Sequence, residues 1–423
     1  MSGSVLARCL LALLGGLALF LADYPVSQPW LVLLAFAPLL WVTLAARSRR
    51  EASAYGIFWG LGRTVPLAYM LGSFGLPVPA RFAVEAYLLG LDVVFALVAF
   101  QLRALRTWPL LVALTFAVIE YADSRLPMWG TARSVARLFS PYAQASGLLR
   151  LGGIAAFAIA VVLVQALFVL GAQRRQLKSA LAGAVVLVVA AVLSVARTPI
   201  TTRTLRVAAV ARGRDDIAGR AEAFVAEAAT RRAKIIVFPE VTFTMASGAR
   251  SEFERHWSAI ARENAIFIVV PYVDEVLSES NRLMVFDSAG RKRGEYTKRH
   301  LVPLAERSPA GAGPLLVIDV DGVRVGTLIC QDDNFSDLAR SYAALGAQLL
   351  VVPTFEGPPA VAPYHLRNSA LRAIENPIAL VRSVAQGESA AIAPGGKIID
   401  SFEPDRLGAG VMVTDVPVVR AAR

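Results

Sequence analysis

Apolar residues form long continuous runs over the first 200 positions of the chain, and shorter runs separated by polar residues over the rest. Seven of the long runs approach the ~20 residues that a helix needs to cross the hydrocarbon core of a bilayer, although the fifth is shorter. Proline and glycine lie between several of them, where a helix would end. We therefore predict seven membrane-spanning helices, near residues 5–22, 29–46, 54–73, 82–101, 108–122, 148–171 and 179–196.

From Thr204 onward the pattern changes to short apolar runs of strand length that alternate with amphipathic helices. Strands are predicted at 205–210, 235–238, 265–272, 282–286, 316–320, 323–330, 348–352, 378–383 and 389–393, and helices at 217–232, 252–264, 335–345 and 365–376. Such alternation over ~220 residues predicts one layered α/β domain, long enough to bury its own core. We expect a membrane domain over 1–199 and an α/β domain over 200–423.

The charge of the chain follows the same division. The net charge is +11, and residues 1–199 carry 16 Lys and Arg against 6 Asp and Glu, while residues 200–423 carry 27 against 26. The basic excess therefore belongs to the loops between the predicted spans, which argues against nucleic acid as a partner. Nine of these basic residues fall on one side of the spans and six on the other. This bias places the N-terminus in the cytoplasm, so that seven spans leave the α/β domain outside it.

The charged residues Arg63, Glu85 and Asp92 fall inside the third and fourth predicted spans. Charged side chains are costly within a bilayer, so they are either functional or paired with one another. The sequence leaves both interpretations open.

Cys9 lies in the first apolar run and Cys330 in the α/β half of the chain, so no disulfide between them is predicted. The position of Cys330 instead suggests a catalytic role. It ends the apolar run that begins at Val325, as a nucleophile at the edge of a sheet would. A thiol attacks carbonyl carbon as thiolate and needs a base or a cation beside it. Glu240, after a strand and a proline, can be the base, and Lys298 can lower the thiol pKa and stabilise an oxyanion. Each of these residues, taken alone, also has an ordinary structural explanation. Cys330 can be a small buried apolar residue, Glu240 part of a turn, and Lys298 part of a solvated basic loop.

Three short motifs around these residues resemble the signatures of the nitrilase, or carbon–nitrogen hydrolase, superfamily: Phe238-Pro239-Glu240, Tyr296 to Pro303 with Glu306, and Leu328-Ile329-Cys330. Seven predicted spans ahead of such a domain resemble the apolipoprotein N-acyltransferase family, bacterial enzymes that add the third acyl chain to lipoproteins. Further segments are similar to those of that family: Leu126 to Gly130, Asn281, Tyr364 to Leu366 and Arg372 to Glu375.

This resemblance implies an αββα sandwich in which Glu240 is the general base, Lys298 the oxyanion stabiliser and Cys330 the nucleophile, with Glu306 as the family's second glutamate. It implies that Cys330 takes an acyl chain from a phospholipid such as phosphatidylethanolamine as a thioester. The acceptor would be the α-amine of a diacylglyceryl-cysteine lipoprotein. No cofactor is implied. The expected location is the bacterial inner membrane, with the catalytic domain on the periplasmic side.

The chain differs from the family pattern at several positions. Gln331 and Asp332 stand where the family has Tyr-Glu, residues 353–357 lack its tryptophan, Gln386 replaces an asparagine, and no span is predicted after the α/β domain. Gln331 and Asp332 are therefore expected to be supporting or substrate-binding residues that bear on the acceptor.

Two alternatives remain. One is a membrane-anchored amidase or hydrolase of the nitrilase type, or an acyltransferase with another amine acceptor. The other is a weakened relative that binds lipid without turnover. Seven spans are more than an anchor needs, and the intact Glu–Lys–Cys set argues against a relative without activity.

Overall fold

The computed structural model describes residues 3–23, 26–73, 76–140, 147–196, 199–213, 215–275, 279–303, 305–357 and 362–420. The chain divides into two compact units, which are described separately. The first comprises Met1–Ser124 and Arg133–Thr198, and the second comprises Arg125–Ala132 and Pro199–Arg423. The short segment 125–132 thus belongs to the second unit although helices of the first unit flank it in sequence.

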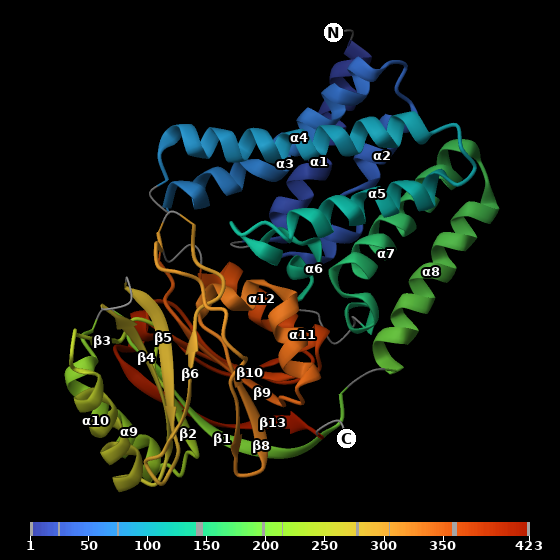
Figure 1. Ribbon diagram of the computed structural model, residues 1–423. Helices are drawn as coiled ribbons and strands as arrows, with labels where there is room; N and C mark the ends of the chain where they lie inside the picture. The colour runs from blue at the N-terminus through green and yellow to red at the C-terminus, as the bar shows by residue number, and fades with distance from the viewer. Residues whose placement is uncertain are drawn as a thin grey trace. The chain divides into compact units, whose positions relative to one another are not determined.

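The first unit is helical, and each of the seven predicted segments coincides with helical structure (Figure 1). Its elements are α1 (Gly3–Ala22), η1 (Pro29–Leu33), α2 (Ala37–Leu44), α3 (Arg49–Ser73), α4 (Val78–Leu102), α5 (Trp108–Asp123), α6 (Val135–Leu138), α7 (Gly147–Arg174) and α8 (Leu177–Ala196). Among the residues described above, three helices are long and apolar enough to cross a membrane: Ser4–Ala22, Val78–Leu102 and Gly147–Arg174. The protein is therefore a membrane protein with several candidate spans.

The segment predicted as one span over 29–46 is broken into η1 and α2. Backbone groups at such a break need partners, because apolar surroundings offer none. The side chain of Gln165 in α7 supplies them: its Oε1 accepts from the amides of Phe36 and Ala37 at 2.9 Å each, and its Nε2 donates to Val32 O at 3.1 Å. A single buried amide thus stabilises the break.

The charged residues within the predicted spans include an ion pair. Arg63 Nη1 of α3 lies 3.1 Å from Asp92 Oδ1 of α4, and the Asp92 side chain is buried. The sequence left open whether these charges are functional or paired, and in the structure Arg63 and Asp92 are paired with each other.

The second unit contains two sheets. The first has the strand order β13-β1-β2-β4-β5-β6, with β3 paired to β4, and the second has the order β12-β11-β10-β9-β8-β7. Their strands are β1 (Thr201–Ala211), β2 (Ile235–Val237), β3 (Phe243–Met245), β4 (Phe267–Asp274), β5 (Ser280–Phe286), β6 (Lys292–Thr297), β7 (Val317–Val320), β8 (Val323–Thr327), β9 (Leu349–Thr354), β10 (Ala379–Val384), β11 (Ser389–Ile392), β12 (Ile398–Phe402) and β13 (Gly410–Val419).

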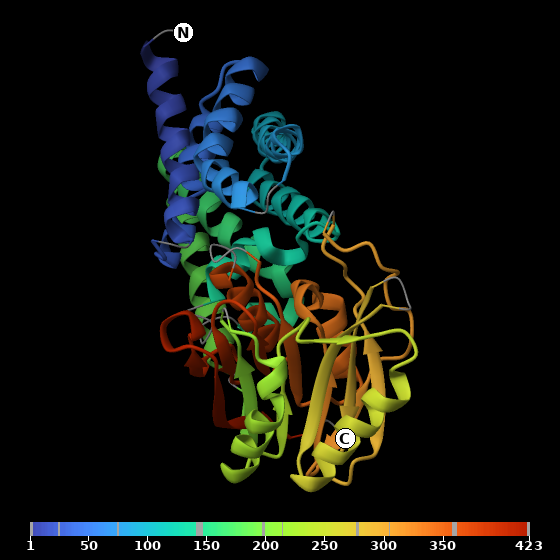
Figure 2. The same ribbon diagram turned by 90° about the vertical axis from the view of Figure 1, so that its left-hand side faces the viewer.

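The sheets pack face to face with helices outside them, which gives a layered α/β sandwich (Figures 1 and 2). Along β1, Leu205 and Val207 enter the core between the sheets, whereas Ala208 and Val210 face α9 (Ala221–Thr230) and α10 (Arg250–Glu263). The second sheet is covered by α11 (Ser336–Ala344) and α12 (Ala362–Glu375). Side chains alternate between the two faces of a strand, so each strand contributes to two layers.

The predicted strands and helices of this unit are present, with shifted ends, but four strands were not predicted: β3, β6, β12 and β13. The β6 sequence KRGEYT is polar, and only one of its six residues is buried, so it lacks an apolar signal. The predicted strand 323–330 ends early, at Thr327, and Cys330 begins a 3₁₀ turn.

Candidate active site

The residues singled out by the sequence follow the carboxyl ends of strands from both sheets. Glu240 lies just after β2, Lys298 just after β6, and Cys330 three residues after β8. Strands β2 and β4 pair in parallel in one sheet, and β8 and β9 in the other. Loops at the carboxyl ends of parallel strands meet at one edge, and this is where α/β proteins gather polar side chains. Glu240, Lys298 and Cys330 are all buried.

Cys330 opens the 3₁₀ turn η5 (Cys330–Asn334) with φ of 47°. A residue other than glycine rarely adopts this left-handed conformation, which costs on the order of 1–3 kcal/mol and is typical of functional sites. The sharp turn explains why the strand cannot continue to Cys330. The thiol donates to Phe355 O over 3.6 Å, and Phe355 directly follows β9.

The carboxylate of Glu240 is the centre of a buried polar network. Its Oε1 accepts from Lys298 Nζ at 2.8 Å and from Asn281 Nδ2 at 2.5 Å, and its Oε2 accepts from the amide of Phe355 at 2.7 Å. Phe355 therefore bonds Glu240 through its N–H and the cysteine through its carbonyl. The backbone of one residue thereby fixes the proposed base and nucleophile relative to each other.

Glu306 forms the second half of this network. Its carboxylate lies 2.9 Å from Lys298 Nζ, accepts from Asn281 Nδ2 at 3.0 Å, and accepts from the amide of Val302 at 2.7 Å. Lys298 thus lies between two carboxylates, and Asn281 of β5 bridges the same two groups. The ammonium has three protons, and the two carboxylates account for two of them.

Electrostatics set the protonation of the lysine and the thiol. Burial alone lowers the pKa of Lys298, but the charges of Glu240, Cys330 and Glu306 outweigh it and raise the pKa above its ordinary value. Burial, followed by the charge of Glu240, raises the pKa of the Cys330 thiol well above its ordinary value, and Lys298 opposes this shift only in part. In the resting state the cysteine is therefore a neutral thiol beside a permanent cation, and it needs a base to react.

The Asp332 carboxylate is fully buried and accepts hydrogen bonds from backbone and side-chain groups of the protein. Its Oδ2 accepts from the Tyr296 hydroxyl at 2.8 Å and from the Ile329 amide at 3.1 Å. Its Oδ1 accepts from the amides of Arg299 and His300 at 3.2 and 2.8 Å. The carboxylate therefore joins the turn of Cys330 to the loop that carries Lys298. The His300 ring stacks on Phe335 with centroids 3.7 Å apart.

Gln331 joins the same turn to the segment 125–132. Its Nε2 donates to Pro127 O at 2.8 Å and to Leu301 O at 3.3 Å. Thr131 Oγ1 donates to Asn334 O at 2.9 Å, and Gly130 adopts φ of 55° where a Cβ would lie 2.5 Å from Asn334 O. A segment from between two helices of the first unit is thus bound directly to the nucleophile turn.

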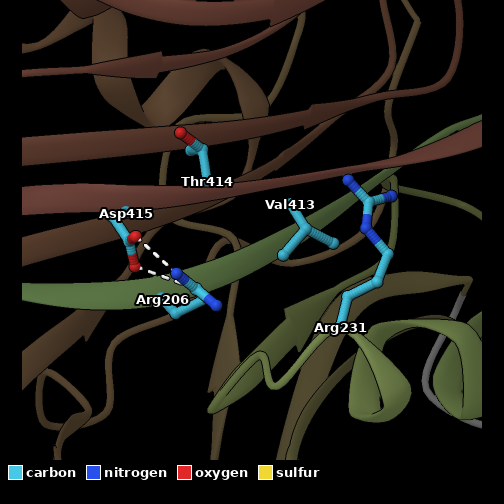
Figure 3. A pocket seen from close by; sticks show the side chains of 5 residues that line it. All are labelled: Arg206, Arg231, Val413, Thr414 and Asp415. Carbon is cyan, nitrogen blue, oxygen red and sulfur yellow. Dashed lines mark hydrogen bonds and ion pairs between the residues drawn. The ribbon is translucent and has the colours of Figure 1, made fainter.

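A surface hollow of about 370 Å³ lies elsewhere on the second unit (Figure 3). It is lined by Arg206, Arg231, Val413, Thr414 and Asp415. Its exposed Arg206–Asp415 ion pair of 2.6 Å belongs to β1 and β13, and it shares no residue with the Cys330 network. Exposed pairs of this kind contribute little, so this hollow is not the candidate active site.

Comparison with known proteins agrees with this architecture. Residues 200–423, more than half of the chain, match the carbon–nitrogen hydrolase family, and the chain belongs to that family. Residues 15–167 match the apolipoprotein N-acyltransferase N-terminal domain. The chain therefore carries a match to an apolipoprotein N-acyltransferase N-terminal domain followed by a carbon–nitrogen hydrolase domain.

Similar proteins include "Apolipoprotein N-acyltransferase 1" of Treponema pallidum, 36% identical over 116 residues, which are 27% of this chain and 21% of that protein. "Apolipoprotein N-acyltransferase" of Gloeobacter violaceus is 36% identical over 138 residues, 27% of this chain and 26% of that protein. The chain thus spans about a quarter of the length of these relatives. A human omega-amidase is 28% identical over 218 residues, 44% of this chain and 78% of that protein. A solved amidase from Nesterenkonia is 23% identical with a TM-score of 0.44, covering 50% of this chain and 93% of its own.

Sequence reasoning missed several residues of this site. Phe355 acts through its backbone, which leaves no signal in a sequence. Asn281 was noted only by resemblance, and its contact with both glutamates depends on the pairing of β5 with β4 and β6. Asp333 and Arg382 were not noticed, although both are buried and charged. An unusual charge within an apolar strand, such as Arg382 in β10, was the available signal.

Proposed function

We propose that the protein transfers an acyl chain from a membrane phospholipid to the N-terminal amine of a diacylglyceryl-cysteine lipoprotein, through a thioester on Cys330. The observation that carries this proposal is the buried network in which Phe355 bonds both Glu240 and Cys330 while Lys298 lies against the same carboxylate. The match of residues 15–167 to an apolipoprotein N-acyltransferase domain supports a lipid donor.

In the first half-reaction, the Cys330 sulfur attacks the ester carbonyl of the phospholipid, and its proton passes to Glu240. The carbonyl oxygen becomes an oxyanion, which Lys298 stabilises with the ammonium proton that its two carboxylates leave over, together with a backbone N–H beside Cys330. Collapse breaks the ester bond. The lysophospholipid leaves as an alcohol with the proton from Glu240, and the acyl chain remains as a thioester.

In the second half-reaction, the neutral α-amine of the lipoprotein attacks the thioester, and an amine proton passes to Glu240. The carbon–sulfur bond breaks, the proton returns to the sulfur, and an amide is formed. Glu306 and Asn281 hold Lys298 and Glu240 in place throughout. Gln331 and Asp332 support the nucleophile turn, and Gln331 also joins that turn to the segment 125–132.

The helical region serves this chemistry by admitting lipid substrates laterally. We propose seven spans over residues 1–199, a catalytic domain over 200–423 on the periplasmic side of the bacterial inner membrane, and phosphatidylethanolamine as a donor. The basic residues on one side of the predicted spans support this orientation.

The test is acyl labelling of the full chain in detergent with phospholipid carrying a labelled acyl chain. We expect one acyl chain on Cys330, removable by hydroxylamine and transferred to a synthetic diacylated lipopeptide. Label that persists in Cys330→Ala would contradict the assignment of the nucleophile. Cys9→Ser is the matched control, because Cys9 lies in α1 and is expected to leave labelling unchanged.

The second candidate is an amidase or hydrolase, which the similarity to an omega-amidase over most of that protein's length supports. In that case water, rather than lipopeptide, opens the acyl-enzyme. The loss of label is therefore measured with and without lipopeptide. Equal rates would favour the hydrolase, whereas acceleration with amide product favours the acyltransferase.

A further inference from the structure

A second buried cluster of charged groups lies next to the catalytic network, centred on His365 of α12. His365 Nε2 lies 2.5 Å from Asp333 Oδ1, and its Nδ1 lies 3.0 Å from Glu356 Oε1. The Ser369 hydroxyl also donates to Asp333, and Arg382 of β10 also pairs with Glu356. All four charged side chains have less than a tenth of their surface exposed.

One carboxylate belongs to the turn of the nucleophile, and the other belongs to the loop whose backbone contacts both the nucleophile and the proposed base. Asp333 is in η5, the turn that Cys330 opens. Glu356 follows Phe355, whose carbonyl accepts from the thiol and whose amide donates to Glu240. His365 is therefore a cross-link between the nucleophile turn and the loop that fixes the proposed base. Its helix supplies Ser369 one turn later, which holds the same Asp333.

Charge balance makes the proton on His365 important. The carboxylates of Asp333 and Glu356 face it from the turn and from the loop after β9, and the Arg382 guanidinium faces Glu356 from β10. Two anions and two cations balance only while the imidazole is protonated. The negative charge of Glu356 also acts on the Cys330 thiol, in the direction that disfavours thiolate. Without the imidazolium, less positive charge would compensate this carboxylate.

We propose that His365, as an imidazolium, is a positioning residue for the active site. By holding Asp333 and Glu356 together, it sets the geometry between Cys330 and the Phe355 peptide and limits the negative charge at the thiol. The role does not require a particular acyl donor, and it rests on the proposed function only in taking Cys330 as the nucleophile.

The test measures alkylation of Cys330 by iodoacetamide in the full chain in detergent, in a Cys9→Ser background where Cys330 is the single thiol. We expect His365→Gln to lower the rate at pH 7.5 at least tenfold, and His365→Lys, which keeps a cation, to recover part of it. His256→Gln is the matched control, because His256 is an exposed histidine of α10 paired with Glu222. Folding is checked by the thermal melting of each variant.

The pH profile supplies a second readout. Burial lowers the pKa of His365, but Asp333 and Glu356 outweigh it and raise the pKa to about 9. Loss of its proton disfavours thiolate, so the plot of log rate against pH should flatten near pH 9 in the wild type and stay straight in His365→Gln. A folded His365→Gln variant that is alkylated at the wild-type rate with an unchanged profile overturns the proposal. Failure of phospholipid to acylate Cys330, with the alkylation pattern intact, counts against the proposed function alone.

Discussion

Replacement of Lys298 by methionine tests the central network directly. The substitution keeps the length of the side chain and removes the cation that lies between Glu240 and Glu306, at 2.8 and 2.9 Å. Lys298 is only 1% exposed, so without it Glu240 would remain buried, and Glu306, whose side chain is 21% exposed, would remain partly buried. Breaking a buried ion pair by removing one partner costs about 3–5 kcal/mol. For a folding unit of this size, each kcal/mol corresponds to ~2–4 °C in Tm, so Lys298→Met should lower the Tm by ~6–20 °C.

The matched control is Lys292→Met in β6. Lys292 also contacts two carboxylates, Glu254 and Glu295, at 2.8 and 3.2 Å, but it is 29% exposed. Partly exposed pairs contribute ~0–1 kcal/mol, so this variant should melt within ~4 °C of the wild type. Melting is followed by the β-sheet circular dichroism signal of the full chain in detergent, because the strands of the described residues belong to the second unit. Equal Tm values for the two variants would refute the claim that Lys298 balances buried charge.

The same lysine predicts a loss of stability in alkali. The folded pKa of Lys298 is raised above its ordinary value of 10.5, so its contribution is complete below that pH. As pH rises above it, the unfolded chain loses the proton first, and the wild type is destabilised relative to Lys298→Met.

Four further predictions concern neighbouring residues. Asn281→Leu removes hydrogen bonds to two carboxylates; loss of the one to Glu240, worth ~1.5–3 kcal/mol, should lower the acyl-transfer rate by ~10–100-fold in the labelling assay. Gly130→Ala should lower the Tm more than Gly248→Ala. Both glycines have positive φ, but only at Gly130 would an added Cβ lie 2.5 Å from another backbone atom, Asn334 O. Equal losses of Tm would contradict the docking of 125–132. The pKa of His365 is raised from 6.5 to about 9, which corresponds to a contribution to stability on the order of 3 kcal/mol. This contribution should be complete below pH 6.5 and should be lost as the pH rises to 9. The free energy of unfolding of His365→Gln should not show this loss. The raised thiol pKa predicts that iodoacetamide alkylates Cys330 more slowly at pH 8 than it alkylates a cysteine in a short peptide, and a faster rate would argue for a preformed thiolate.

Much of the second unit could be predicted from the sequence, because alternating or continuous apolar runs mark strands whose faces are buried. β1, β8 and β9 were found in this way. β6 was not, because a polar edge strand is stabilised by its pairing with β5 rather than by burial of its own side chains. β13 was not predicted either, although it pairs with β1 along nearly its whole length.

The first unit shows the same limit. Hydropathy placed helices at all seven predicted segments, since apolar length is a local property. It did not reveal that 29–46 is broken at Phe36 and Ala37, because the break depends on Gln165, more than 120 residues away in the chain.

The sequence by itself indicated the two-part organisation, because apolar length and periodicity are local properties of the chain. Its short motifs singled out Glu240, Lys298, Glu306 and Cys330 as candidate residues, and the sandwich was implied by the family resemblance of those motifs. Only the tertiary structure decided how their charges are compensated. The Phe355 peptide, Asn281, the segment 125–132 and the Asp333–His365–Glu356 cross-link come from distant parts of the chain. Their effect depends on distances between buried groups, and no local pattern encodes those distances.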